Sequence, residues 1–250
     1  LEKVYNGTLD APATGLKVNG ISNTVGGQTL TLSGVGQMQD KNVGVGKIIA
    51  NNNSLSLGNG SGLASNYTLT GGNNIIEVTP RTTVASGSRF YDGTTSVKGD
   101  IFGTFTNTVG ADTVTVSGIG TINSSEVGSK SVTIGSLSSA HPNYILTGAS
   151  INVTKRPINL SGSRIAEDNR SLIVLADELS VSTVNNEKLT LSGSGSISKN
   201  MPGTIQNISL DTLAFTDGTG LASNYTFSGG RFIMILRHKL TFKQRIREIL

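Results

Sequence analysis

The chain of 250 residues contains no cysteine, no tryptophan and only two histidines. The absence of cysteine excludes disulfide bonds, thiolate zinc sites and cysteine nucleophiles. A Ser-His-Asp triad would have to use His141 or His238, but no G-x-S-x-G turn accompanies either residue. Two histidines, one of them near the end of the chain, do not supply a zinc ligand set. The sequence therefore predicts a protein with no catalytic residue, no metal and no cofactor.

Charged residues are also scarce: they make up 14% of the chain, and the acidic ones are scattered singly. Residues 231–250 hold six Lys or Arg and one Glu against a net charge of +4, so the rest of the chain is close to neutral. A nucleic-acid-binding domain needs a basic stripe on its folded surface, and we therefore expect no nucleic-acid partner. No apolar run approaches the ~18 residues of a membrane-spanning helix. Because the chain begins at Leu1 rather than Met, we expect it to be a piece of a longer protein.

The residues that do abound are glycine, serine, threonine and asparagine, with valine, isoleucine and leucine at regular intervals; glycine alone numbers 32. Leu30 and Leu32 alternate with polar residues, as do Val114 and Val116. Period-two alternation is typical of a β-strand with one buried face, and Asp-Gly and Gly-Gly pairs indicate turns between such strands. The pattern predicts many short strands joined by tight turns.

Four short strings recur in one order with a period of roughly 80 residues, which indicates tandem repeats. The opening string is KVYNGT at 3–8 and RFYDGT at 89–94, and the closing string is IEVTPR at 76–81 and INVTKR at 151–156. The middle string is LTLSGVG at 30–36, VTVSGIG at 114–120 and LTLSGSG at 189–195. The Asn-Tyr string is LASNYTLTGG at 63–72, AHPNYILTGA at 140–149 and LASNYTFSGG at 221–230.

We place three repeats at 1–81, 82–157 and 158–239, followed by a basic tail at 240–250. The third is degenerate, because Arg164 to Asp168 replace the opening string without its Tyr or Gly-Thr. About seven short strands in ~80 residues suit a small antiparallel sandwich. We therefore expect an all-β protein of tandem, immunoglobulin-like antiparallel β-sandwich repeats in an elongated array, with a short C-terminal amphipathic helix. A β-grasp variant of the repeat stays open.

Tyrosines mark the repeats, and we expect their role to be structural. Each tyrosine of the Asn-Tyr strings follows a turn of small residues and enters an alternating strand. This favours either a tyrosine corner, in which the hydroxyl binds nearby backbone, or simply a large core residue. The structural repeat markers are Tyr5, Tyr91, Asp92, Gly93, Tyr67, Tyr144 and Tyr225.

The Tyr-Asp-Gly-Thr of 91–94, the T-V-T-V-S-G downstream, the Asn-Tyr-x-Leu and the closing I-x-V-T-x-R together resemble the YDG-type repeats of large bacterial exoproteins. Those exoproteins are similar to filamentous haemagglutinin. The resemblance covers the first two repeats well and the third in part, with Asn6 in place of Asp in the first. It implies a secreted or cell-surface location associated with the outer membrane, two-partner secretion through an outer-membrane export partner, and adhesion to a host-surface receptor or glycan. It implies no catalytic residue.

The favoured function is a non-catalytic stalk or spacer in a bacterial adhesin, with the neighbouring repeats of the same chain as partners. The alternative is a glycan- or protein-binding module whose repeat loops contact the host ligand. Sugar sites usually use an exposed aromatic platform, but the chain has no Trp and only five Tyr, three of them in the Asn-Tyr strings. A hydrolase is disfavoured, because no acid–base pair is visible.

The C-terminus breaks the repeat pattern. Aligning Gly229-Gly230 with Gly71-Gly72 places Ile235 on Glu77, so the last strand is apolar on both faces. Residues 240–250 then form the chain's only helix-like segment, basic on one side and apolar on the other. Three interpretations stay open: the end of a truncated reading frame, a fold-back over Ile233 and Ile235, or contact with an anionic membrane surface.

Overall fold

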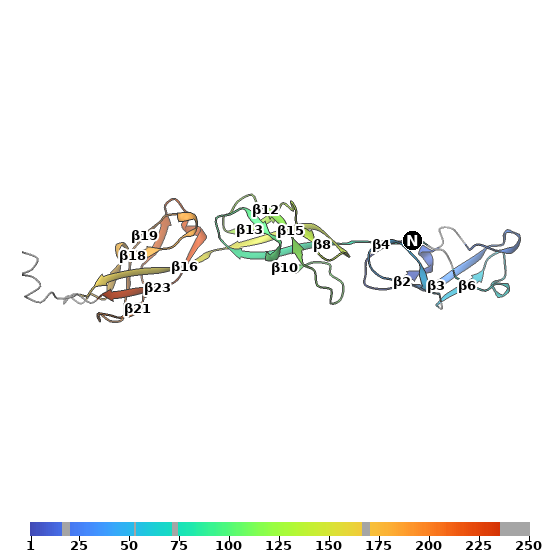
Figure 1. The fold of residues 1–250 in the computed structure, drawn as a ribbon, viewed down its shortest axis with the longest axis horizontal. Coiled ribbons are helices and arrows are strands. Elements are labelled where there is room, and N and C mark those ends of the chain that lie inside the picture. The colour runs from blue at the N-terminus through green and yellow to red at the C-terminus, as the bar shows by residue number, and fades with distance from the viewer. Residues whose placement is uncertain (17–20, 53, 72–74, 167–170, 236–250) are drawn as a thin grey trace, which may run out of the picture. The chain divides into compact units, whose positions relative to one another are not determined.

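The computed structural model describes residues 1–16, 21–52, 54–71, 75–166 and 171–235 (Figure 1). Within these ranges the protein consists of β-strands in several small sheets, and each helical element is a single 3-10 turn of three residues. The all-β expectation is confirmed at this level. The described part contains no helix of the length and apolarity that a membrane span requires. The helix expected at 240–250 lies outside the described residues.

The first repeat has two small sheets, in the orders β1-β7-β4 and β2-β3-β5, with β6 also paired to β3. Three 3-10 turns, η1 (Ala13–Gly15), η3 (Val25–Gly27) and η4 (Ala64–Asn66), lie between the strands. The strands are β1 (Glu2–Val4), β2 (Asp10–Pro12), β3 (Leu30–Met38), β4 (Gly44–Lys47), β5 (Ile49–Asn51), β6 (Leu55–Asn59) and β7 (Ile76–Thr79).

The second repeat has a four-stranded sheet in the order β10-β8-β15-β13 and two ladders, β11-β14 and β12-β9. Its one 3-10 turn is η5 (Gly99–Ile101). The strands are β8 (Arg81–Phe90), β9 (Ser96–Lys98), β10 (Phe102–Phe105), β11 (Val116–Ser117), β12 (Ile119–Thr121), β13 (Gly128–Val132), β14 (Ser138–Ser139) and β15 (Tyr144–Thr154).

The third repeat has the same plan: a sheet in the order β18-β16-β23-β21 and the ladders β17-β20 and β19-β22. Its 3-10 turns are η6 (Ala176–Glu178), η7 (Val184–Asn186) and η8 (Ala222–Asn224). The strands are β16 (Arg156–Ile165), β17 (Ile173–Leu175), β18 (Leu179–Val181), β19 (Leu189–Ser192), β20 (Ser194–Ser196), β21 (Ile205–Asn207), β22 (Ala214–Asp217) and β23 (Tyr225–Ile235).

The opening and closing strands of a repeat lie side by side. β1 pairs with β7 and β16 pairs with β23, and both pairs are parallel. Figure 1 shows β16 and β23 together, and β8 and β15 are also neighbours in their sheet. The expectation of purely antiparallel sheets is wrong in this respect. Parallel neighbours need a long crossover, which here is the body of each repeat, so the chain enters and leaves a repeat in the same direction.

The contacts divide the described chain into two compact units, each with its own core. The first holds residues 1–87, 96–122 and 131–151, and the second holds residues 88–95, 123–130 and those from 152 onward. The second repeat therefore contributes to both units, and the boundaries at 81 and 157 stay a prediction. The core of the first unit includes Tyr5, Ala11, Leu16, Met38, Ile76, Val78, Val114 and Tyr144. The core of the second includes Leu160, Val174, Ile197, Ile208, Leu213, Phe232 and Met234.

The Ser-Gly of the middle string is a corner at which the chain passes from one ladder to another. Before Gly118 the chain pairs with β14, and after it with β9. Likewise β19 pairs with β22 before Gly193, and β20 pairs with β17 after it. Gly118 and Gly193 have φ of +94° and +85°, and a Cβ on either would lie 2.2 Å from a carbonyl oxygen. Only glycine fits, because it has no Cβ and adopts positive φ freely.

The closing strand of the third repeat corrects the alignment made from the sequence. The Ala166 amide donates to the Ile235 carbonyl at 3.0 Å, as the Tyr91 amide donates to that of Thr154 at 2.8 Å. Ile235 therefore takes the place of Thr154, not that of Glu77. The Gly-Gly alignment fails because the first repeat has two more residues between its Asn-Tyr string and its closing strand. Ala166 stands where the earlier repeats have the opening tyrosine.

The faces of β23 agree with the expected pattern. Phe232 and Met234 are fully buried, whereas Ile233 and Ile235 are 45% and 43% exposed. The strand is thus apolar on both faces. The fold-back proposed for 240–250 stays a prediction.

Gly118→Ala should destabilise the protein by about 1–3 kcal/mol, because it combines backbone strain with a clash against the Ser136 carbonyl. Gly103→Ala is the matched control, since a Cβ there meets nothing within 4 Å. Chemical and thermal unfolding followed by circular dichroism measures both variants. Equal unfolding midpoints for the two variants would contradict the corner role of Gly118.

Candidate functional site

Two tyrosines from successive repeats meet on one carboxylate in the first unit. The hydroxyls of Tyr5 and Tyr144 both donate to Oδ2 of Asp112, at 2.9 and 2.8 Å. Their rings pack edge to face with centroids 5.7 Å apart, and both side chains are buried. We call Tyr5, Asp112 and Tyr144 the first joint. It connects the opening string of the first repeat to the Asn-Tyr string of the second.

The second unit contains the same arrangement, which we call the second joint. The hydroxyls of Tyr91 and Tyr225 donate to Oε1 and Oε2 of Glu187, at 2.6 and 2.7 Å. The two rings lie edge to face at 5.5 Å, and both side chains are buried. Four of the five tyrosines in the chain are thus used in two equivalent joints. Since edge-to-face pairs contribute ~0.5–1.5 kcal/mol beyond burial, the rings stabilise each joint as well as the hydroxyls.

A short turn positions each carboxylate. The Asp112 amide donates to the Val109 carbonyl at 3.0 Å, and the Val109 amide in turn donates to the Tyr144 hydroxyl at 2.8 Å. In the second joint Val184 takes the place of Val109 and donates to Tyr225 at 3.3 Å. The tyrosine hydroxyl therefore accepts from backbone and donates to a carboxylate. We call the turn, its acceptor and the Asn-Tyr residues of one repeat a socket.

The hydroxyl of Tyr144 binds an amide 35 residues earlier in the chain and a side chain that it shares with another repeat. A tyrosine corner binds backbone only a few residues away. The tyrosine-corner interpretation is therefore wrong about the partner of the hydroxyl, which is not backbone a few residues away. The alternative, a large core residue, is also incomplete, since the hydroxyl is as engaged as the ring.

In both joints the asparagine before the socket tyrosine holds a loop of the preceding repeat. Asn143 is buried; its Oδ1 accepts from the Val43 amide at 2.9 Å, and its Nδ2 donates to Oδ1 of Asn42 at 2.8 Å. Asn224 is likewise buried, and it binds the Val127 amide and the Glu126 carboxylate. Buried amides of this kind are stabilising only when they are fully hydrogen-bonded. Each joint therefore has a second polar contact beside the tyrosine pair.

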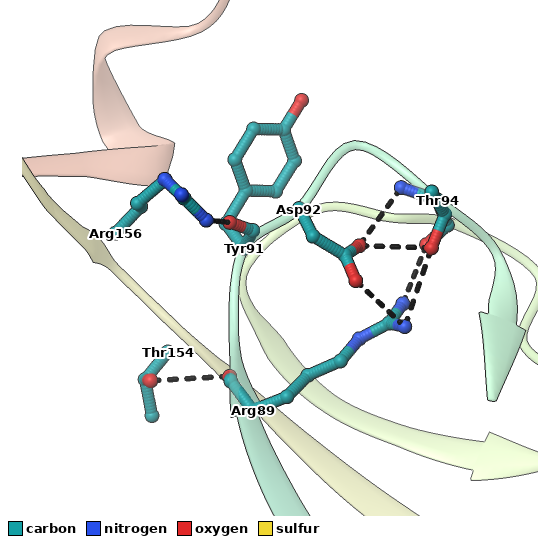
Figure 2. A network of polar contacts seen from close by, with 6 residues as sticks. All are labelled: Arg89, Tyr91, Asp92, Thr94, Thr154 and Arg156. Carbon is teal, nitrogen blue, oxygen red and sulfur yellow. Dashed lines mark hydrogen bonds and ion pairs between the residues drawn. The ribbon is translucent and has the colours of Figure 1, made fainter. Parts of the chain in front are cut away.

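The opening loop that presents Tyr91 is fixed by its own side chains (Figure 2). Asp92 accepts from the amide and the hydroxyl of Thr94, both at 2.9 Å, and forms an ion pair with Arg89 at 3.1 Å. Arg156 of the closing string donates to the Tyr91 carbonyl at 3.3 Å. In the first repeat Asn6 binds Thr8 in the same way as Asp92 binds Thr94. These contacts fix the shape of the loop.

The glycine of the opening string allows the close approach of the two repeats. Gly7 and Gly93 have φ of +78° and +71°, a region that glycine enters at little cost. A Cβ on Gly7 would lie 2.7 Å from Cγ1 of Val109, and one on Gly93 would lie 2.4 Å from Nδ2 of Asn185. Any larger residue at these positions would push the loop away from the socket.

The joints shift the pKa of the groups within them. Burial, reinforced by the hydrogen bond to Glu187, raises the pKa of Tyr225 to about 12 and that of Tyr91 further still. Burial also raises the pKa of Tyr5 and of Tyr144. The Tyr144 hydroxyl, assisted by that of Tyr5, lowers the pKa of Asp112. Both joints are therefore built for neutral phenols, and the first is built around an ionised Asp112.

Chemically this arrangement holds two surfaces together. Among the described residues no group of three or more His, Cys, Asp or Glu is arranged to hold a metal ion. His141 packs edge to face on Tyr144 at 5.0 Å, and its Nδ1 accepts from the Asn143 amide at 3.2 Å. It therefore supports the first joint rather than facing solvent as an ordinary turn residue would.

The structure unites residues that the sequence left apart. The ring of Tyr5 packs on that of Tyr144, and the ring of Tyr91 packs on that of Tyr225. Asp92 and Gly93 shape the loop that presents Tyr91. The carboxylates Asp112 and Glu187 were missed, because each looks like an isolated turn acid. A signal exists: the first, second and third repeats place Gln28, Asp112 and Glu187 two residues before the first residue of the middle string.

These observations define a tandem-repeat β protein in which a tyrosine loop of one repeat is buried in the next. A model of the YDG domain matches residues 1–74 and 76–152, so the chain belongs to the YDG domain family. The matched segments are the first two repeats, which carry the Tyr-Asn-Gly-Thr and Tyr-Asp-Gly-Thr strings. No curated protein and no solved structure was found to match the chain.

Tyr144→Phe should destabilise the first unit by about 1.5–3 kcal/mol, because it removes a hydrogen bond to a charged acceptor and leaves the Val109 amide unpaired. Tyr67→Phe is the matched control: its hydroxyl binds Gln28 and Val25 in an exposed setting, so the loss should be less than about 1 kcal/mol. Urea unfolding monitored by circular dichroism compares the two variants. A loss at Tyr144 no larger than at Tyr67 would contradict the joint.

The stability of the protein should fall as pH rises from about 10 towards 12, because the joint tyrosines hold their protons in the folded state and release them near pH 10 when unfolded. Below pH 10 this contribution is fully present. The measurement is the urea midpoint as a function of pH, together with tyrosinate absorbance, which no tryptophan obscures. The Tyr91→Phe/Tyr225→Phe variant should show a smaller alkaline loss. Titration of all tyrosines in one step near pH 10 would exclude the effect.

Proposed function

We propose that the chain is a non-catalytic spacer, a stalk segment of a secreted or cell-surface bacterial adhesin of the filamentous-haemagglutinin-like kind, exported by two-partner secretion. The observation that supports it is the pair of equivalent joints, in which four buried tyrosines couple each repeat to the next. Burying this many polar side chains is costly unless they are hydrogen-bonded, and in the joints their hydrogen bonds hold one repeat to the next. The resemblance of the strings to exoprotein repeats supports the location and the export route.

The joints suit a segment that carries load. Separating two repeats at a joint exposes two tyrosine rings and breaks the one hydrogen bond that joins the tyrosine of the earlier repeat to the carboxylate of the later one, which contributes ~1.5–3 kcal/mol. The asparagine contacts and the arginine that binds the tyrosine carbonyl add to this. A chain of weakly attached domains would bend at every boundary, whereas one locked in this way transmits force from repeat to repeat.

The proposal includes an elongated array of sandwich-like repeats. Small repeats with modest cores gain stability from contacts with their neighbours. The parallel opening and closing strands support it, since the chain leaves each repeat in the direction in which it entered. The buried tyrosines also bear on the alternative of a glycan-binding module, because rings enclosed in joints cannot stack on a sugar.

Small-angle X-ray scattering of the full chain tests the spacer function. A compact globule of this length would have a radius of gyration of ~18 Å, and we expect a value well above it. Asp112→Ala combined with Glu187→Ala should add flexibility between repeats, seen as a broader distance distribution. Asp100→Ala combined with Asp177→Ala makes the same charge change at exposed acids and should leave the scattering unchanged. A value near ~18 Å would refute the array.

A glycan array probed with the full chain separates the two functions. The spacer function predicts no specific binding. Specific micromolar binding, abolished by substitutions in the loops and not by those in the joints, would replace the spacer function with the binding-module alternative.

A further inference from the structure

The first repeat carries a third socket with no tyrosine loop in it. The Tyr67 hydroxyl donates to Oε1 of Gln28 at 2.7 Å and accepts from the Val25 amide at 3.1 Å. Tyr144 makes the same two contacts with Asp112 and Val109, and Tyr225 makes them with Glu187 and Val184. We call Val25, Gln28, Asn66 and Tyr67 the first-repeat socket.

The backbone of this socket matches the two occupied ones. The Gln28 amide donates to the Val25 carbonyl at 3.1 Å, just as the Glu187 amide donates to that of Val184 at 3.0 Å. The residue after the valine has a left-handed backbone in all three repeats, with φ of +61° at Gly26, +54° at Gly110 and +52° at Asn185. The socket therefore has its docking shape before anything occupies it.

Two features differ, the acceptor, which is a neutral amide at Gln28 and a carboxylate in the other sockets, and the burial. Asn143 and Asn224 are buried at 2% and 1% exposure, whereas Asn66 is exposed. Tyr67 is only half-buried, while Tyr144 and Tyr225 are buried, and Val25 is 72% exposed. The residues that bind the preceding repeat in the second and third sockets thus face solvent in the first.

We propose that the first-repeat socket is a docking site for the opening loop of another YDG domain joined in tandem before it. The loop would place its tyrosine ring edge to face on Tyr67 and its hydroxyl on Gln28. Its glycine would pass over Val25, as Gly7 passes over Val109. This docking proposal extends the spacer function proposed above. It rests on that function, because both require repeats that are coupled through their joints.

The occupant must be a whole domain rather than a tyrosine peptide. In the occupied joints Asn143 and Asn224 bind the backbone of a separate loop of the preceding repeat, at Val43 and Val127. Asn66 lacks a corresponding loop among the described residues. Only a folded YDG domain presents the tyrosine loop and this second loop together.

A second copy of the chain does not fit as the occupant. Its two opening tyrosines, Tyr5 and Tyr91, are buried at 1% and 3% exposure in its own joints, and its third repeat has Ala166 at that position. An additional repeat is therefore the partner to which the geometry points.

The direct experiment is an in-register duplication. Tyr5 and Tyr91 are 86 residues apart, so a copy of residues 1–86 placed directly before Leu1 continues the repeat in phase. The added segment supplies a tyrosine loop, a copy of the loop at Val43, and Arg81 to Ser86 as the missing part of the opening strand. The matched control carries Tyr5→Ala in the added copy alone. Hydrogen exchange of residues 21–30 and 63–69 is compared among the duplicated chain, the control and the 250-residue chain.

Docking should slow exchange at the Val25 amide and in the Asn66–Tyr67 segment at least about tenfold, because one net hydrogen bond of ~1.4 kcal/mol corresponds to that factor. The control should exchange as the 250-residue chain does. Gln28→Glu should increase the protection in the duplicated chain only, since a charged acceptor binds two hydroxyls more strongly than a neutral one. Equal exchange in the duplicated chain and its control would overturn the proposal.

Two further outcomes are distinguishable. If Tyr144→Phe loosens the first joint while the first-repeat socket stays unprotected, the docking proposal fails and the spacer function stands. If Tyr144→Phe leaves the first joint unchanged and the first-repeat socket also stays unprotected, both the docking proposal and the spacer function fail. Concentration-dependent association of the 250-residue chain that Tyr67→Ala abolishes would identify a second copy as the occupant and overturn the tandem one.

Discussion

A partly buried carboxylate shared by two buried phenols is the constraint on which the coupling of the repeats depends. Withdrawing part of a carboxylate from water carries a desolvation cost unless hydrogen bonds replace the lost water. At Asp112 and Glu187 the replacement comes from one tyrosine of each repeat, so neither repeat alone supplies both donors. Phenylalanine would bury the same ring, but it has no hydroxyl to donate to the carboxylate. The same carboxylate thus makes the contact specific, because an apolar side chain in place of either tyrosine leaves the charge underpaired.

The short motif that defines the family follows from this contact. Tyrosine supplies the ring and the donor, and the Asp or Asn after it fixes the loop by accepting from the threonine. The glycine lies at positive φ against the neighbouring repeat, where a Cβ would collide. The closing arginine holds the tyrosine carbonyl from the other side of the same junction. Four residue types that look like an ordinary turn are therefore the parts of one docking device.

Sequence reasoning anticipated the strands and the YDG repeats, because burial alternation and recurring strings are local signals. It did not anticipate the parallel strand pair, since alternation reports which face is buried and not which strand lies alongside. Nor did it find Asp112, whose partners Tyr5 and Tyr144 lie 107 and 32 residues away. An acid in a turn has a sufficient local explanation, which concealed its distant role. The Gly-Gly alignment of the last strand failed for a related reason: strings record similarity, but hydrogen bonds decide the register.

Each joint also has a polarity. The phenol comes from the repeat that is earlier in the chain and the acceptor from the later one, so the two contacting surfaces differ and the contact is heterologous. Such contacts do not close into a two-fold dimer. Instead, each repeat that presents an opening tyrosine can dock into one further repeat. Ala166 ends this series of contacts, because it has a methyl group where the first two repeats have the ring and hydroxyl of a tyrosine. A domain joined behind the third repeat in the same register would keep the donor from its own tyrosine but would find no second one, so the side chain at position 166 decides whether a joint of this kind can form there.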